Sequence, residues 1–212
     1  FMPVPTADFI YEENEMITKL DLEGESKIIP SPFEVQVSSE TLTLNKSINL
    51  ICDSEFVNEA EYLENRLNEF YDLGVTKNSE GSSDIKLVRQ RSKYQDKSEE
   101  AYDLIIDPGG IEIRAQEKSG IFYGIQSLLA LPVEIPSDKK VDQISFPHTE
   151  IFDQPRFGYR GFQLDVVRNF QTKETVKKLI DVLANYKINT FLFYLTEDEG
   201  WRLEIESLTE LN

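Results

Sequence analysis

The chain has 212 residues, which is enough for one large domain or two small ones. Its 39 acidic and 22 basic residues give a formal net charge of -17. This balance argues against nucleic acid and against an anionic membrane surface as partners, because both require clustered Lys and Arg. A neutral substrate such as a sugar is compatible with it.

Two residue types that build many catalytic and metal sites occur once each. Cys52 is the only cysteine and stands in a strand-like stretch, so it is interpreted as a structural residue that forms no internal disulfide. His148 is the only histidine, and a zinc site usually needs further His or Cys ligands. We therefore expect no metal site and no cofactor. No stretch approaches the roughly 18 uninterrupted apolar residues of a membrane span.

The first part of the chain predicts an α+β domain over residues 28–143. Residues 1–27 are acidic and weakly periodic, as in a linker or the tail of a preceding domain. Alternating residues in PSPFEVQVSSETLTLNKSINLIC indicate short strands. EFVNEAEYLENRLNEFYDLG predicts a helix that stops at Gly74, with an apolar face made of Phe56, Ala60, Leu63, Leu67 and Phe70.

YDLIIDPGGIEIRA predicts a hairpin that turns at Asp107-Pro108-Gly109-Gly110, and SGIFYGIQSLLALP predicts a second helix that Pro132 ends. Together these elements predict an antiparallel sheet covered by two helices. The polar stretch PSDKKVDQ, residues 136–143, marks the boundary to the next unit.

Residues 144–212 predict a strand, a helix and a second strand. The strand lies near 159–168, and TKETVKKLIDVLANYK forms an amphipathic helix with Thr172 as its N-cap. Its inward face is expected to consist of Val176, Leu179, Ile180, Leu183 and Tyr186. INTFLFYL is apolar on both faces, as in a buried parallel strand, so the three elements make a βαβ unit. Such a unit cannot bury itself, and we expect the remainder of its own chain, or a partner chain, to cover it.

LTEDEGWRLEI, residues 195–205, places three adjacent carboxylates after this apolar strand. Glu197, Asp198 and Glu199 are compatible with a catalytic Asp-Glu pair or with an ordinary solvated turn. Two adjacent residues do not easily converge on one bond, because strand neighbours point to opposite faces.

PRFGYRGFQLDVVRNF and LTEDEGWRLEI resemble the start of the catalytic barrel of family-20 glycoside hydrolases, the β-N-acetylhexosaminidases. RNF and DEGWR are most similar to the chitobiase-like branch of that family. YDLIIDPGGIEIRA and SGIFYGIQSLL are similar to the small α+β domain that precedes the barrel. The resemblance implies that residues 144–212 open a (β/α)8 TIM barrel and that the chain is an N-terminal fragment of a longer enzyme.

The resemblance also implies an activity. Family members remove terminal β-linked N-acetylhexosamine from glycans or chitooligosaccharides, with the substrate's own 2-acetamido group attacking C1. The family's catalytic Asp-Glu pair follows a later strand, so it is expected beyond Asn212 and the chain alone is expected to be inactive. By the same resemblance we expect export to the periplasm, the cell surface or the medium.

Carried over by position, Arg168 falls on the family arginine that binds hydroxyls of the terminal sugar. A structural ion pair with Asp165 or with an acid of a neighbouring strand is the alternative, and Arg160 is interpreted as structural. Glu197 takes the first Asp of the family's D-D-x-G-W motif and Asp198 the second, and both are expected to support the active site. Trp201 and Arg202 either pack the loop or contact the ligand.

Two departures from the family pattern leave further readings open. The family's His-x-His is replaced by Leu192-Phe193-Tyr194, and Glu197 is one methylene longer than Asp. A shift of about 1 Å can cost about 10²-fold in rate. A non-catalytic glycan-binding or structural relative, or a glycosidase of different sugar specificity, therefore remains an alternative.

Overall fold

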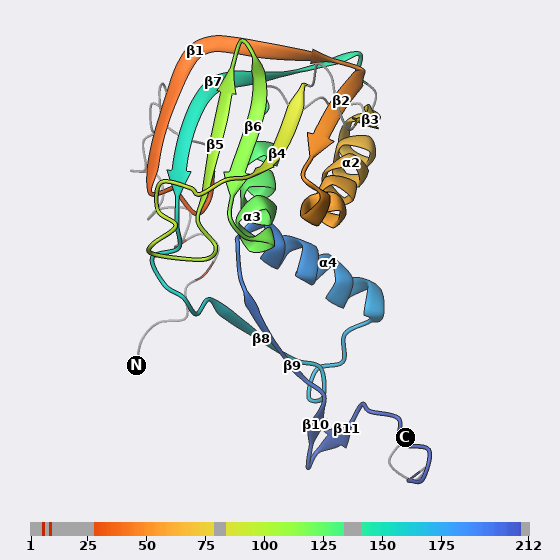
Figure 1. Ribbon diagram of the computed structural model, residues 1–212. Helices are drawn as coiled ribbons and strands as arrows, with labels where there is room; N and C mark the ends of the chain where they lie inside the picture. The colour runs from red at the N-terminus through yellow and green to blue at the C-terminus, as the bar shows by residue number, and fades with distance from the viewer. Residues whose placement is uncertain (1–5, 7–8, 10–27, 79–83, 134–140, 209–212) are drawn as a thin grey trace.

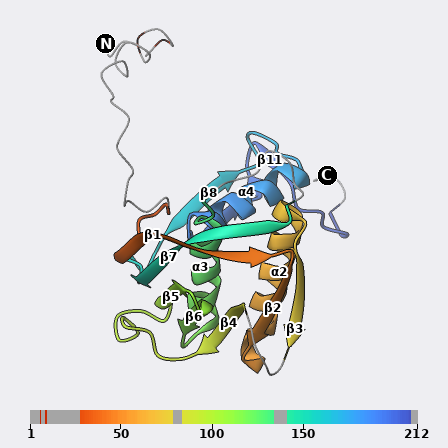
Figure 2. The same ribbon diagram turned by 90° about the horizontal axis from the view of Figure 1, so that it is seen from above.

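The computed structural model describes residues 6, 9, 28–78, 84–133 and 141–208. Figures 1 and 2 show a large sheet with helices packed against it, and a smaller region of helix and strands beyond one end of that sheet. The predicted α+β domain followed by a βαβ unit is confirmed. The strands of the large sheet are β1 Glu34–Asn45, β2 Ser47–Cys52, β3 Gly74–Asn78, β4 Ile85–Arg89, β5 Tyr102–Asp107, β6 Gly110–Ala115 and β7 Gln143–Asp153.

The seven strands are ordered β1-β7-β5-β6-β4-β2-β3. The pairs β1–β7, β7–β5 and β5–β6 are antiparallel, whereas β6–β4, β4–β2 and β2–β3 are parallel. The sheet is therefore mixed, and the prediction of an antiparallel sheet holds for one half only. For the pair β2–β3 the physical reason is helix α2 (Val57–Tyr71) between them, because a helical crossover returns the chain in the same direction.

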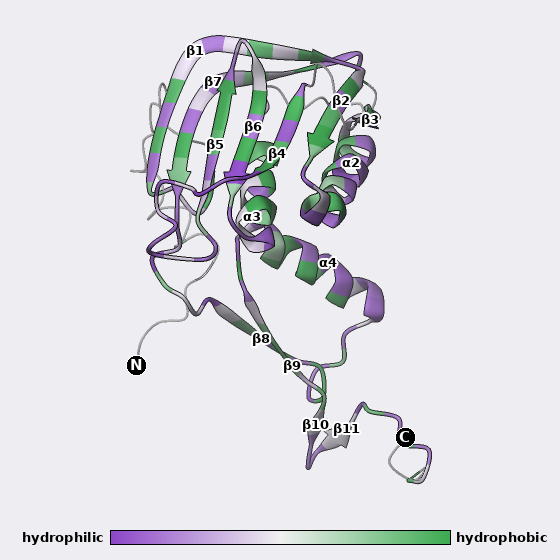
Figure 3. Cartoon of the chain, in the orientation of Figure 1, coloured by the Kyte–Doolittle hydropathy of each residue, from purple (hydrophilic) through white to green (hydrophobic). Residues whose placement is uncertain are grey.

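Two helices cover one face of this sheet, as Figure 1 shows. They are α2, Val57–Tyr71, which follows the short 3-10 turn η1 (Ser54–Phe56), and α3, Lys118–Leu129. The core between helices and sheet is fully apolar at its centre, with Leu50, Leu63, Leu104, Ile113 and Ile125 at 0% exposure. Figure 3 shows the matching alternation of hydrophobic and hydrophilic residues along the strands.

The C-terminal end and the buried face of helix α2 both differ from the prediction. Tyr71 is buried, whereas Phe70 is 41% exposed and lies under the guanidinium of Arg66. The helix is terminated by Asp72, which adopts a left-handed conformation with φ 57°, and Gly74 already belongs to β3. The hairpin prediction is confirmed, because Asp107 pairs with Gly110 across a two-residue turn.

The βαβ unit consists of β8 Gly161–Asp165, α4 Lys173–Asn185 and β9 Thr190–Tyr194. The two strands pair in parallel. Thr172 caps α4 as predicted, since its side chain accepts a hydrogen bond from the amide of Thr175. Of the predicted inward residues of α4, Val176 and Leu183 are buried, whereas Ile180 and Tyr186 are 47% and 48% exposed.

A two-strand hairpin, β10 Thr196–Glu197 and β11 Gly200–Trp201, follows β9. The large sheet continues to Asp153, ten residues past the predicted domain limit at 143, because β7 pairs with both β1 and β5. Residues 1–27, apart from 6 and 9, and residues 136–140, the first part of the predicted boundary at 136–143, lie outside the described residues. Among the described helices, none is long and apolar enough to cross a membrane.

Candidate functional site

Arg168 stands just past the C-terminal end of β8, and its neighbour on that strand holds it in place. Asp165 accepts hydrogen bonds from the backbone amides of Val167 and Arg168 at 2.9 and 3.1 Å. Its other oxygen accepts from Nε of Arg168 at 2.6 Å. The side chain of Arg168 is still 56% exposed. The ion pair with Asp165, which the sequence left open as the structural alternative, is therefore present, and it orients the guanidinium without covering it.

Glu197 lies beside Arg168, on β10, three residues past the end of the neighbouring strand β9. Its carboxylate oxygen is 3.9 Å from Nη2 of Arg168. The hydroxyl of Tyr194, the last residue of β9, donates a hydrogen bond to the same carboxylate. The structure thus brings together Arg168 and Glu197, which are 29 positions apart in the sequence. Parallel strands place their carboxyl ends at one edge, and this is the edge where barrel enzymes bind substrate.

Both carboxylates at this edge are kept in their charged form. The hydrogen bond from Tyr194, followed by the hydrogen bond with Asp198, lowers the pKa of Glu197 below its usual 4.5. Hydrogen bonds from Arg168 lower the pKa of Asp165 below its usual 3.8. A general acid at neutral pH needs a raised pKa. Glu197 and Asp165 are therefore suited to accepting hydrogen bonds from a ligand or from Arg168, and not to donating protons.

Arg202 connects the loop after β8 with the hairpin after β9. Its Nη2 donates to the carbonyl of Val167 at 2.9 Å, and its Nε donates to the carbonyl of Val166 at 3.2 Å. Its own amide donates to the carbonyl of Leu195. Of the two roles left open for Arg202, the structure shows loop packing. These hydrogen bonds of Arg202 fix the relative position of the segments that carry Arg168 and Glu197.

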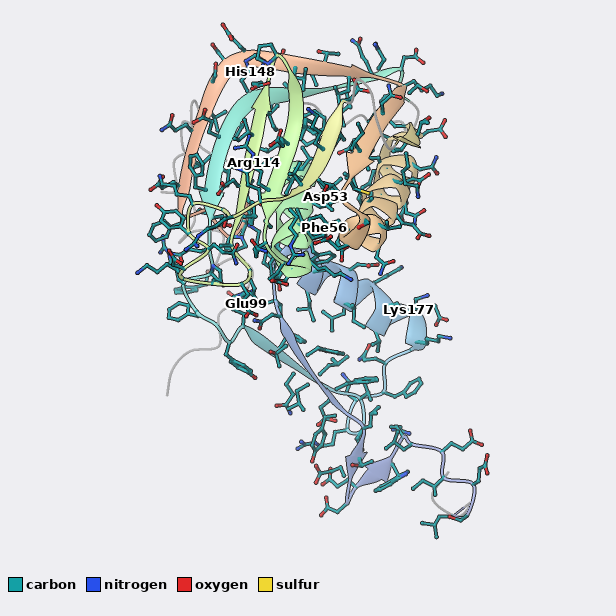
Figure 4. The ribbon with its side chains drawn as sticks, in the orientation of Figure 1. Asp53, Phe56, Glu99, Arg114, His148 and Lys177 are labelled. Carbon is teal, nitrogen blue, oxygen red and sulfur yellow. The ribbon has the colours of Figure 1, made fainter. Side chains whose placement is uncertain are left out.

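The remaining acids of the triplet do not converge on a common point. Asp198 and Glu199 are the exposed turn residues between β10 and β11. His148 lies on β7 at the far end of the large sheet from this hairpin, as Figure 4 shows, and bonds to Glu40. In the described part of the chain, no group of three or more His, Cys, Asp or Glu residues has the arrangement of a metal site.

The contact between Tyr194 and Glu197 is a feature that the sequence did not reveal. In the sequence Tyr194 was noted only as part of the stretch that replaces the family's His-x-His, and the fold shows that its hydroxyl meets Glu197. A weak signal was available, because Tyr194 and Glu197 are three residues apart across the end of a predicted strand. The arrangement as a whole offers guanidinium donors and a carboxylate acceptor side by side on an open edge. Such a pair suits a ligand with several hydroxyl groups.

Known sequence families match almost all of the chain. The family described as Glycosyl hydrolase family 20, domain 2 matches residues 25–154, and the one described as Glycosyl hydrolase family 20, catalytic domain matches residues 157–212. The first match covers the large sheet with α2 and α3. The second covers β8, α4, β9 and the hairpin.

Individual relatives agree with these matches. A beta-hexosaminidase of Vibrio vulnificus is 36% identical over 211 residues, which are 99% of this chain and 23% of that protein. An N,N'-diacetylchitobiase of Vibrio harveyi is 31% identical over 201 residues, 95% of this chain and 22% of that protein. The crystal structure of a GH20 exo β-N-acetylglucosaminidase from Vibrio harveyi in complex with N-acetylglucosamine superposes with a TM-score of 0.76 at 33% identity, over 88% of this chain and 28% of that one. The chain thus spans about a quarter of the length of these relatives.

Proposed function

The chain belongs to glycosyl hydrolase family 20, and on that premise we propose that the whole protein removes terminal β-linked N-acetylhexosamine from glycans or chitooligosaccharides. The observation that carries the proposal is the meeting of Arg168 and Glu197 at the C-terminal ends of β8 and β9. The names of the relatives support the choice of sugar, since one is a diacetylchitobiase and another was crystallised with N-acetylglucosamine.

In this proposal Arg168 binds the hydroxyl groups of the terminal sugar. Asp165 occupies its Nε, and in the described part of the chain no hydrogen-bond partner occupies Nη1. The guanidinium therefore keeps donors for a neutral ligand, at a strand end where such ligands bind in barrels. Glu197 accepts from a neighbouring hydroxyl or keeps the arginine oriented.

Acid–base chemistry belongs to other residues in this proposal. The family resemblance places the catalytic Asp-Glu pair after a later barrel strand than β9, and Glu197 has a lowered pKa that does not suit a general acid. We therefore expect the 212-residue chain, expressed alone, to release no sugar from a hexosaminide. The complete gene product is the form in which activity is to be measured.

The test is hydrolysis of p-nitrophenyl N-acetyl-β-glucosaminide by the complete gene product and its Arg168→Ala variant. Loss of charged hydrogen bonds to substrate is expected to lower kcat/KM by about 10- to 100-fold, because each such bond contributes about 1.5–3 kcal/mol. Arg91→Ala is the matched control, since Arg91 is 65% exposed and forms a comparable surface ion pair with Asp96. Wild-type kcat/KM in Arg168→Ala would exclude the proposed role of Arg168.

A second candidate function is sugar binding without turnover. It is favoured by Tyr194 and Glu197, which bond to each other where the family pattern has a His-x-His strand and an Asp. The measurement is calorimetric titration of the complete gene product with N-acetylglucosamine and chitobiose. Binding together with no hydrolysis of any hexosaminide would favour this candidate over the enzyme.

The family resemblance also carries the proposal that the protein acts outside the cytoplasm, where polymeric glycans are met. Cell fractionation with an antibody against the protein tests it. Recovery in the periplasmic, surface or secreted fraction is expected, and recovery in the cytoplasm alone would contradict it.

A further inference from the structure

Lys187 crosses from the βαβ unit into the core of the first domain. It follows α4 in a left-handed conformation with φ 57° and is only 6% exposed. Its Nζ donates to the hydroxyl of Tyr102 on β5 and to the carboxylate of Asp153 at the end of β7, at 2.8 Å each. A lysine in this conformation and this deeply buried persists only where the surroundings fix it.

Each carboxylate oxygen of Asp153 accepts two hydrogen bonds. One oxygen accepts from the amides of Phe33 and Gln154 at 3.0 and 2.9 Å. The other oxygen accepts from Lys187 and from the hydroxyl of Tyr102, the latter at 2.8 Å. Since the single proton of Tyr102 is used on Asp153, the phenol oxygen can only accept from Lys187 and from Ser127, which is 2.6 Å away. The network therefore has a place for a cationic donor at position 187.

A second polar contact ties the beginnings of both strands to the same domain. Arg160 precedes β8 and donates from Nη2 to Glu100 at 2.7 Å, while Asn189 precedes β9 and donates to the other oxygen of Glu100 at 3.0 Å. Nε of Arg160 also donates to the carbonyl of Lys187 at 2.7 Å. The two strands are thus held at their amino ends by residues of the first domain.

We propose that Lys187 is a positioning residue that locks β8 and β9 onto the first domain, with Arg160 and Asn189 as its second contact. The domain then serves as the support on which the edge carrying Arg168 and Glu197 is held. The importance of this positioning for Arg168 and Glu197 rests on the function proposed above. The attachment of β8 and β9 to the first domain through Lys187 does not.

Burial energetics agree with a positioning role. Desolvation lowers the pKa of Lys187 even though Asp153 acts in the opposite direction, so the ammonium is held there at a cost. Replacing a buried ion pair by apolar packing is often neutral or stabilising, whereas removing one partner alone is destabilising because it leaves an uncompensated buried charge. In our proposal the pair places the βαβ unit, and loss of Lys187 alone leaves Asp153 without its cationic partner.

The test is hydrogen exchange followed by mass spectrometry on the 212-residue chain. In Lys187→Met we expect the amides of residues 161–165 and 190–194 to exchange at least about tenfold faster, because the unit opens locally. Residues 102–107 and 110–115 are expected to keep their wild-type rates. Lys177→Met is the matched control, since Lys177 is an exposed lysine on α4 (Figure 4). Wild-type rates in β8 and β9, or equal acceleration in β5 and β6, would overturn the proposal.

Two further variants separate hydrogen bonding from packing and from misfolding. Lys187→Arg retains a cationic donor, and a cavity of about 410 Å³ bordered by Lys187, Tyr102 and Asp153 leaves room for it. It is expected to restore most of the protection that Lys187→Met loses, and exchange as fast as in Lys187→Met would overturn the proposal. If Lys187→Met does not fold, Asn189→Ala takes its place. We expect it to accelerate exchange in β8 and β9 by a smaller factor than Lys187→Met. Wild-type exchange rates in both strands of Asn189→Ala would overturn the proposal. None of these experiments measures hydrolysis. The positioning role of Lys187 can therefore be confirmed even in a protein that has no hexosaminidase activity.

Discussion

The two regions of this molecule bury their apolar residues to very different extents. In the first domain, the side chains between the mixed sheet and helices α2 and α3 are closed off from solvent, and Leu104 is 0% exposed. In the βαβ unit, Leu192 and Phe193 of strand β9 are 51% and 39% exposed. The same residue types thus form a core in one region and a surface in the other.

The difference teaches which interactions hold each region. The first domain is stabilised by its own apolar core. The βαβ unit has little core of its own among the described residues, and a buried polar contact, through Lys187 and Asp153, joins it to the first domain. Mutations of equal chemistry are therefore expected to have unequal effects in the two regions, which makes the comparison testable.

The largest expected effect comes from removing a buried leucine of the first domain. Leu104→Ala is expected to lower the free energy of unfolding of this chain by about 2–5 kcal/mol, since it deletes apolar contacts and leaves a cavity. Leu192→Ala is the matched variant in β9 and is expected to cost less than about 1 kcal/mol, because half of its side chain already contacts water. Urea denaturation followed by circular dichroism measures both. Equal losses would contradict the contrast between the regions.

A smaller effect is expected where helix α3 touches the sheet. A Cβ added at Gly124 would lie 2.5 Å from Cγ2 of Ile113 and 3.2 Å from Cδ2 of Tyr102. Gly124→Ala is therefore expected to cost about 1–3 kcal/mol through overpacking, offset by up to about 1 kcal/mol from better helix propensity. Gly158→Ala, before β8, meets nothing within 4 Å and is expected to change stability by less than about 0.5 kcal/mol. A stabilised Gly124→Ala variant would show that the packing between helix and sheet is looser than described.

Local sequence patterns predicted where turns and helix caps lie better than they predicted which residues pack inward and which strands are parallel. The turn at Asp107–Gly110 and the cap at Thr172 follow from residue chemistry alone, and both are confirmed. The face of α2 was misjudged because Phe70 and Tyr71 are adjacent aromatic residues, and packing buries the tyrosine and leaves the phenylalanine exposed. The strand directions were misjudged because alternation does not distinguish a parallel pair from an antiparallel one.

The candidate site was predictable in part. Arg168 was proposed as a site residue through its motif, and the ion pair with Asp165 that the structure shows was the alternative left open. The hydrogen bond of Tyr194 and the burial of Lys187 were not predicted, because both depend on tertiary contacts. A lysine after a polar helix end is normally expected on the surface. The contacts of Tyr194 and Lys187 can be recognised only once β9 is paired with β8 and the βαβ unit is placed against the large sheet.

The smallest expected effect compares two carboxylates, one in each region. Glu197 has its pKa lowered chiefly by Tyr194, whereas Glu34 on β1 has its pKa lowered chiefly by Lys93 and only secondly by Tyr94. Tyr194→Phe is therefore expected to raise the pKa of Glu197 toward 4.5 by more than Tyr94→Phe raises the pKa of Glu34. Carboxyl carbon chemical shifts, followed by NMR during a pH titration, measure both values.

The sign of the accompanying stability change follows from linkage. A carboxylate whose folded pKa lies below its unfolded value contributes stability above the unfolded pKa, and this contribution is lost as the pH falls through the folded pKa. For Glu197 that loss is expected below pH 4.5, and it should be smaller in Tyr194→Phe. A pKa of Glu197 that does not respond to Tyr194→Phe would show that Arg168 and Asp198 hold the carboxylate charged. The open edge would then be organised by the arginine, and Tyr194 would be free to contact the ligand directly.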